Sequence, residues 1–116
     1  MTALEIARLM RLNRFRLGHE ALLQEDVEAL FRREGVPFQR EHIFGPADRV
    51  DFFVDGRVAV ELKIRCAKRR ILRQLERYAA HDVVEGLVLA SVNAVGIPPQ
   101  LAGKPLFIVP LGLTGL

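Results

Sequence analysis

Two carboxylates and an ammonium lie in this sequence at positions where their side chains could converge. Asp51 and Glu61 are ten residues apart, and Lys63 follows Glu61 at the two-residue spacing that places both on one face of a strand. Carboxylate oxygens suit Mg²⁺ or Mn²⁺, which keep several waters and accept phosphate oxygens as further ligands. An adjacent lysine can orient or help deprotonate an attacking water and neutralise charge that develops on phosphorus. The pattern is typical of phosphodiester hydrolysis.

A β-hairpin is needed to bring the two carboxylates together, and the sequence contains a strong signal for one. Asp55-Gly56 separates two β-rich runs, so we predict strands over residues 49–54 and 57–64. The second run alternates, so that one face takes Val58, Val60, Leu62 and Ile64, and the other takes Arg57, Ala59, Glu61 and Lys63.

The length of the hairpin loop decides whether the two carboxylates share a face. A two-residue loop pairs Asp51 with Val60 and sends Asp51 and Glu61 to opposite faces. A three-residue loop over residues 54–56 pairs Asp51 with Ala59, which makes Glu61 its diagonal neighbour on the same face at roughly 7–8 Å. The hydrophobic pattern favours this second register, which collects on one core face Val50, Phe52, Val58, Val60 and Leu62.

The remaining elements alternate as in an α/β fold. Apolar spacing and a capping box at Thr2 and Glu5 predict helices over about residues 3–12 and 19–35, and a third helix whose inner stripe is Ile71, Leu75, Tyr78 and Ala79. Further strands are predicted over residues 36–44, 87–91 and 106–109, with room for one helical turn in the Gly/Pro-rich loop between the last two. We expect one domain over residues 1–116, with a mixed β-sheet flanked by helices.

At the proposed site the sequence resembles a known family. Asp51 followed by Glu61-Leu62-Lys63 on the next strand resembles the metal-binding signature of the PD-(D/E)XK nuclease superfamily. The core of that superfamily has the order αβββαβ, which matches the predicted order over nearly the whole chain. Gln74 and Tyr78 resemble the Q-x-x-x-Y motif of its RecB-like and lambda-exonuclease-like branches, where the motif lies beside the active site.

The resemblance implies a restriction-endonuclease-like fold and a deoxyribonuclease that depends on Mg²⁺ or Mn²⁺. It implies that Asp51 and Glu61 ligate the metal and that Lys63 handles the attacking water. Gln74 and Tyr78 would line the site. Tyr78 could also be an ordinary core aromatic, because it shares its helical stripe with apolar residues.

In the resembled family a third carboxylate comes from the helix before the first strand, and three glutamates could supply it here. Glu20 lies on the same helical face as the apolar stripe of residues 19–35. Glu25 and Glu28 lie roughly 200° and 100° from Val27 at 100° per residue, so they should point outward or sideways. We therefore expect Glu20 to be the third metal ligand. Gln24 lies near the same stripe and could hydrogen-bond a metal-bound water.

A basic run adjoins the predicted site and could contact DNA phosphates. The same run could equally be a solvated helix face, and both interpretations stay open. Its members are Lys68, Arg69, Arg70 and Arg73.

Composition excludes several classes of protein. Half of the 116 residues are apolar, so the chain can form a core without disulfides, and the lone Cys66 excludes a disulfide scaffold or a cysteine zinc cage. We expect Cys66 to be a buried or spectator thiol. A net charge of +3 permits an anionic partner but is low for a nucleic-acid-coating protein. Prolines and glycines interrupt the apolar C-terminal third, so we expect a soluble, cytoplasmic protein that binds no membrane.

The sequence as a whole predicts a metal-dependent DNA nuclease, with endonuclease and exonuclease action both open. A homodimer is one way for a domain with one site to act on the two strands of a duplex. Two other functions stay open. One is a catalytically silent DNA-binding module, and the other is a structural subunit of a larger DNA-processing complex, which the small size and the apolar tail over residues 106–116 would suit.

Overall fold

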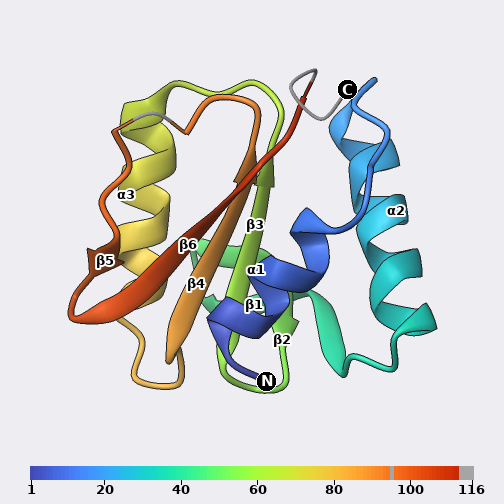
Figure 1. Cartoon of the computed structure of the whole chain (residues 1–116). Coiled ribbons are helices and arrows are strands. Elements are labelled where there is room, and N and C mark those ends of the chain that lie inside the picture. Colours follow the sequence, from blue (N-terminus) through green and yellow to red (C-terminus); the bar gives the residue numbers. More distant parts are fainter. Residues whose placement is uncertain (95, 113–116) are drawn as a thin grey trace.

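The computed structural model describes residues 1–94 and 96–112. Within these residues three helices cover a six-stranded mixed sheet, which is an α/β fold (Figure 1). In chain order the elements are α1 (Ala3–Arg11), α2 (Glu20–Arg33), β1 (Phe38–Gly45), β2 (Asp48–Val54), β3 (Val58–Lys63), α3 (Lys68–Ala79), β4 (Gly86–Ser91), β5 (Gln100–Leu101) and β6 (Lys104–Pro110).

Helices α1 and α2 begin and end within one or two residues of the predicted ranges. The Thr2 hydroxyl accepts a hydrogen bond from the Glu5 N–H at 3.2 Å, and the Glu5 carboxylate accepts one from the Thr2 N–H at 2.8 Å, so the capping box of α1 is confirmed. After α2 the chain turns at Gly35, whose φ of 68° is accessible to glycine without strain. The buried stripe of α3 is the predicted one.

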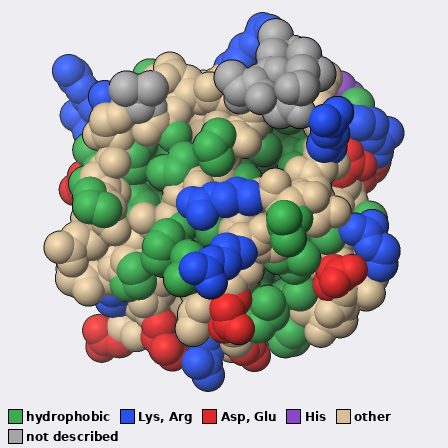
Figure 2. All heavy atoms as spheres, viewed as in Figure 1, with side chains coloured by type: hydrophobic (Ala, Val, Ile, Leu, Met, Phe, Trp, Pro, Cys, Tyr) green, Lys and Arg blue, Asp and Glu red, His purple; other side chains and the backbone are tan. Residues whose placement is uncertain are grey.

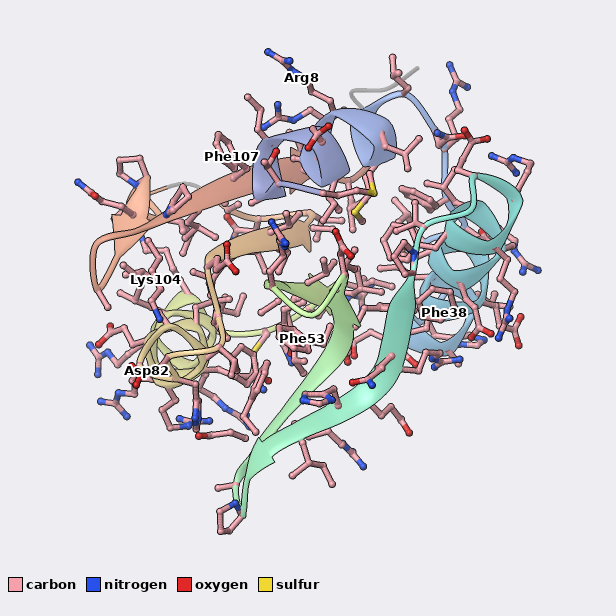
Figure 3. The ribbon with its side chains drawn as sticks, turned by 90° about the horizontal axis from the view of Figure 1, so that it is seen from below. Arg8, Phe38, Phe53, Asp82, Lys104 and Phe107 are labelled. Carbon is pink, nitrogen blue, oxygen red and sulfur yellow. The ribbon has the colours of Figure 1, made fainter. Side chains whose placement is uncertain are left out.

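The sheet has the strand order β1-β2-β3-β4-β6-β5. Strands β1, β2 and β3 pair antiparallel, whereas β3, β4 and β6 pair parallel. Helices α1 and α2 cover one face and α3 covers the other (Figures 1 and 3). Phe38 points toward α2, while Phe53 packs on the α3 side (Figure 3). The central strands are therefore covered on both faces, which explains why every residue of β4 is buried.

The β2–β3 hairpin has a different register from the predicted one. Val54 pairs with Val58, and Arg57 N–H donates to the Val54 carbonyl at 3.0 Å. The loop thus has three residues, as predicted, but it is displaced by one position because Asp55 adopts a left-handed φ of 53° beside Gly56. The predicted pairing of Asp51 with Ala59 is wrong. The parity is unchanged, so Asp51 and Glu61 still share a face.

The prediction that Val50 shares a core face with Phe52 is also wrong. Phe52 packs with the α1 and α2 cluster, and Val50 packs with the α3 cluster. The same change of face occurs on the neighbouring strand at Glu41, whose φ of 51° is left-handed. A left-handed residue turns the strand over and interrupts the alternation of side chains. This change of face occurs level with Asp51, between the pairs Arg40–Phe52 and His42–Val50.

The loop between β4 and β6, for which the sequence suggested one helical turn, instead contains the short strand β5. Gln100 and Leu101 pair with the start of β6 through a two-residue turn at Ala102 and Gly103, both with positive φ. The last residues of the predicted apolar tail, 113–116, lie outside the described residues. Among the helices of the described chain, none has the length and apolar character needed to cross a membrane.

Candidate functional site

Asp51 and Glu61 lie beside each other where the β2–β3 ladder ends. The last paired residues are Phe52 and Val60, and the two carboxylates come next on their strands. The Asp51 N–H donates to Glu61 Oε1 at 3.2 Å, and the Leu62 N–H donates to Asp51 Oδ2 at 2.8 Å. Each carboxylate therefore accepts a hydrogen bond from a backbone N–H that would donate to a carbonyl of the opposite strand in a regular ladder. The two side chains are held at one place, as the hairpin argument predicts.

Burial and mutual repulsion act on both carboxyl groups. Only 2% of the Glu61 residue is exposed. Burial, reinforced by the Asp51 charge, raises the pKa of Glu61 to about 8. Burial also raises the pKa of Asp51, although the Leu62 N–H and Lys63 oppose the shift. Without a further positive charge, the pair is therefore costly to ionise fully.

Lys63 supplies positive charge to this pair. Its Nζ lies 3.1 Å from Glu61 Oε2, and its side chain is 19% exposed. Burial by itself lowers the pKa of Lys63, but Glu61, Asp51 and Glu20 outweigh burial and raise it. The predicted convergence of two carboxylates and an ammonium is thus present in the structure.

A chain of polar contacts from α2 and β1 holds Asp51 from the other side. Gln24 Nε2 donates to Asp51 Oδ1 at 3.3 Å, and Gln24 Oε1 accepts from Arg40 at 2.7 Å. Arg40 also donates to Glu28 at 2.8 Å and lies over the Phe52 ring. Because Arg40 takes the amide oxygen, the amide NH₂ of Gln24 is directed at Asp51.

Of the three glutamates considered on α2, Glu20 points toward the site. Its carboxylate accepts from the Ile64 N–H at 3.4 Å, one residue beyond Lys63. Glu25 instead pairs with Arg16, and Glu28 pairs with Arg32 and Arg40. The helical spacing therefore predicted which of the three glutamates points toward the site. A metal-ligand role for Glu20 stays a prediction.

Tyr78 and Gln74 approach the site from α3. Tyr78 is fully buried; its hydroxyl donates to the Arg49 carbonyl at 2.6 Å and lies 3.4 Å from Glu61 Oε1. Burial, together with the nearby Glu61 and Asp51 charges, raises the pKa of Tyr78. Tyr78 is thus both a core aromatic and a neighbour of the site. Gln74 lies one turn earlier on α3 and lines the adjoining cleft.

The cleft beside the carboxylates has a volume of about 330 Å³ and is strongly basic. Lys63 connects it to the carboxylate pair. Its lining residues are Lys63, Cys66, Arg70, Arg73, Gln74 and Arg77. Among the described residues, Lys68 and Arg69 lie outside this lining, so only Arg70 and Arg73 of the predicted basic run belong to it. Cys66, expected to be a buried or spectator thiol, is half-buried in the lining.

Sequence reasoning missed Arg77, Asp48 and His81. Arg77 Nε donates to Asp48 at 2.9 Å, and His81 Nε2 lies 2.8 Å from the same carboxylate. These contacts hold the pKa of Asp48 below its usual value, since the His81 and Arg77 hydrogen bonds outweigh burial. Arg77 was detectable, because it follows Arg73 by four residues and so shares its helix face. Asp48 and His81 are 33 residues apart, and no local pattern joins them.

A divalent cation such as Mg²⁺ needs oxygen ligands that lie close together. In the part of the chain that is described, no three His, Cys, Asp or Glu side chains stand close enough together to hold a metal ion. The predicted set of Glu20, Asp51 and Glu61 is therefore not brought together closely enough in this structure to form a three-carboxylate site. Asp51 and Glu61 do lie together, and their hard oxygens suit Mg²⁺ or Mn²⁺. Mg²⁺ is commonly bound through one or two carboxylates and keeps several waters. The residues therefore fit such an ion.

A scan against protein-family models found no matching family, and searches of curated proteins and of solved structures found no similar protein.

Proposed function

We propose that this protein is a Mg²⁺- or Mn²⁺-dependent deoxyribonuclease with a PD-(D/E)XK, restriction-endonuclease-like core. One observation carries the proposal: the buried Glu61 carboxylate, which lies beside the half-buried Asp51, is 3.1 Å from the Lys63 ammonium, and Lys63 lines a basic cleft. A phosphodiester is anionic, so the cleft attracts it and the ammonium faces it. The order of helices and strands supports the same core.

The metal, held by Asp51 and Glu61, would supply Lewis-acid polarisation of the phosphate and a more acidic bound water. Lys63 has three N–H donors and uses one on Glu61, so two remain for a water or a phosphate oxygen. Its positive charge opposes the negative charge that develops on phosphorus as water attacks and an ester oxygen leaves. Gln24 and the Leu62 N–H keep the Asp51 carboxylate in one orientation.

Arg70 and Arg73 give the cleft contacts to backbone phosphates, which position DNA without reading its sequence. DNA as the partner, a cytoplasmic location and a homodimer or larger DNA-processing complex belong to this proposal.

A cleavage assay tests the function. Plasmid, linear and branched DNA are incubated with Mg²⁺, Mn²⁺ or EDTA, and Lys63→Ala is compared with Arg8→Ala, a change on the exposed surface of α1. We expect metal-dependent products with the wild type and Arg8→Ala, and loss of cleavage with EDTA or with Lys63→Ala. Cleavage that survives in EDTA or in Lys63→Ala would reject the proposal. DNA binding without cleavage would favour the catalytically silent module.

A further inference from the structure

One face of α3 carries a stripe of basic and polar side chains along the cleft. Arg70, Arg73, Gln74 and Arg77 follow one another at intervals of three, one and three residues, which places them on one side of the helix. All four line the cleft. The three arginines form a row of positive charges, which could bind successive phosphates of a single nucleic-acid strand.

A cluster of aromatic rings continues this stripe. Arg77 and His81 both bind Asp48, at 2.9 and 2.8 Å, so His81 lies next along the surface. Phe44 stacks on the His81 ring, with centroids 5.2 Å apart and planes 24° apart. His42 contacts Phe44 at 5.0 Å and stacks on Phe53 at 4.8 Å. His42, Phe44 and His81 are each half-buried, so each retains some exposed surface.

We propose that the α3 stripe and these three rings together bind single-stranded DNA. Phosphates lie on Arg70 and Arg73, and one or more bases stack on the surface formed by His42, Phe44 and His81. The inference rests on the proposed nuclease function and specifies the form of DNA that enters the site.

Two observations favour a single strand over a duplex. In a duplex the faces of the bases are covered by their neighbours, whereas a single strand leaves them free to stack on aromatic side chains beside a cationic groove. The cleft volume of about 330 Å³ is also at the small end of the range of roughly 300–1,000 Å³ for small-molecule sites. Such a space suits a group of nucleotide size. Lys63 lines this space and lies 3.1 Å from Glu61, so a phosphate that enters the space comes next to the ammonium of the carboxylate pair.

The test measures binding in EDTA, where metal-dependent cleavage cannot interfere. Fluorescence anisotropy compares a labelled single-stranded oligodeoxynucleotide with the duplex of the same sequence. The variants are His42→Ala, His42→Phe and Arg73→Ala, and Arg8→Ala is the control because Arg8 projects from α1, away from α3 (Figure 3). Other Lys and Arg side chains lie among hydrophobic ones on that α1 side of the molecule (Figure 2).

We expect the wild type to prefer the single strand and His42→Ala to weaken binding by about five-fold to a hundred-fold. His42→Phe should retain binding because it keeps a stacking ring, Arg73→Ala should weaken it, and Arg8→Ala should leave it unchanged. Equal or tighter binding of the duplex, or a His42→Ala variant that binds like the wild type, would overturn the inference. Binding as expected without any cleavage in Mg²⁺ would reject the nuclease and leave the binding surface standing.

Discussion

The Glu61 carboxylate accepts a hydrogen bond from the backbone N–H of Asp51 at 3.2 Å, across the end of the β2–β3 ladder. In return the Asp51 carboxylate accepts from the N–H that follows Glu61 in the chain, that of Leu62, at 2.8 Å. Each acidic side chain is thus oriented by the main chain of the opposite strand. The two carboxylates lie together because the strands do, and loss of one charge should leave the hairpin intact.

Glu61→Gln should abolish cleavage and stabilise the metal-free protein at alkaline pH. The pKa of Glu61 is about 8 in the folded protein, compared with 4.5 for an unperturbed glutamate. Between these two pH values the wild type loses stability as pH rises, because the unfolded chain ionises Glu61 more readily than the folded protein does. Gln carries no such cost. Thermal melts in EDTA should give a higher Tm for Glu61→Gln near pH 8 and a smaller difference near pH 5. Equal melting temperatures at both pH values would contradict the assigned cost of burial.

Lys63 and Glu61 should be energetically coupled. Lys63→Ala removes the partner of a buried carboxylate, so it should abolish cleavage and destabilise the protein near pH 8, whereas in a Glu61→Gln background the same change should cost little. A double-mutant cycle by denaturant unfolding should give a coupling of about 1–3 kcal/mol. Additive effects would mean that the two groups do not interact in solution.

Glu20→Gln should weaken metal binding and reduce cleavage severalfold or more, because Glu20 reaches the backbone beside Lys63. Glu25→Gln is the matched control, since Glu25 is exposed and pairs with Arg16. Glu28→Gln is a weaker control, because Glu28 holds Arg40 and through it Gln24. Calorimetric titration with Mg²⁺ and cleavage rates would check the ranking. A larger loss in Glu25→Gln than in Glu20→Gln would place the metal elsewhere.

Asp48→Asn should destabilise the protein at neutral pH by about 1–3 kcal/mol, because Asp48 accepts hydrogen bonds from Arg77 and His81. The lowered pKa of Asp48 means that its ionised form stabilises the fold above about pH 4, and that this contribution disappears as pH falls through the folded-state pKa. Urea unfolding of both proteins near pH 7 and pH 3 should show a smaller difference in acid. A difference that is as large in acid as at pH 7 would indicate a role other than charge.

Neutralising Arg70 and Arg73 together should flatten the salt dependence of DNA binding. Both line the cleft, and loss of two phosphate contacts should reduce the log–log slope for a single strand by about 1.4. Lys68→Ala with Arg69→Ala is the matched control, because those side chains lie outside the lining among the described residues, and it should change the slope less. The opposite ranking would shift the phosphate contacts to the N-terminal end of α3.

Local periodicity determined much of this protein from sequence alone. The capping box of α1, the buried stripes of α2 and α3, and the common face of Glu61 and Lys63 each depend on residues within a few positions of one another. Side-chain direction along a helix or strand repeats at a fixed interval, so spacing alone selected Glu20 from three glutamates. The parity of the hairpin followed from the same reasoning.

Two kinds of feature were visible only in the tertiary structure. They are left-handed backbone conformations within strands and hairpin loops, and contacts between residues that are far apart in the sequence. Asp55 and Glu41 adopt left-handed φ values, the first in the displaced loop and the second level with the place where Val50 changes to the other face of the sheet. A pattern that assumes a regular strand has no signal for such a reversal. Asp48 meets Arg77 and His81, and Arg40 meets Gln24, across 16 or more residues of chain. These contacts form because folding brings separate elements together, and side-chain spacing within one element carries no record of them.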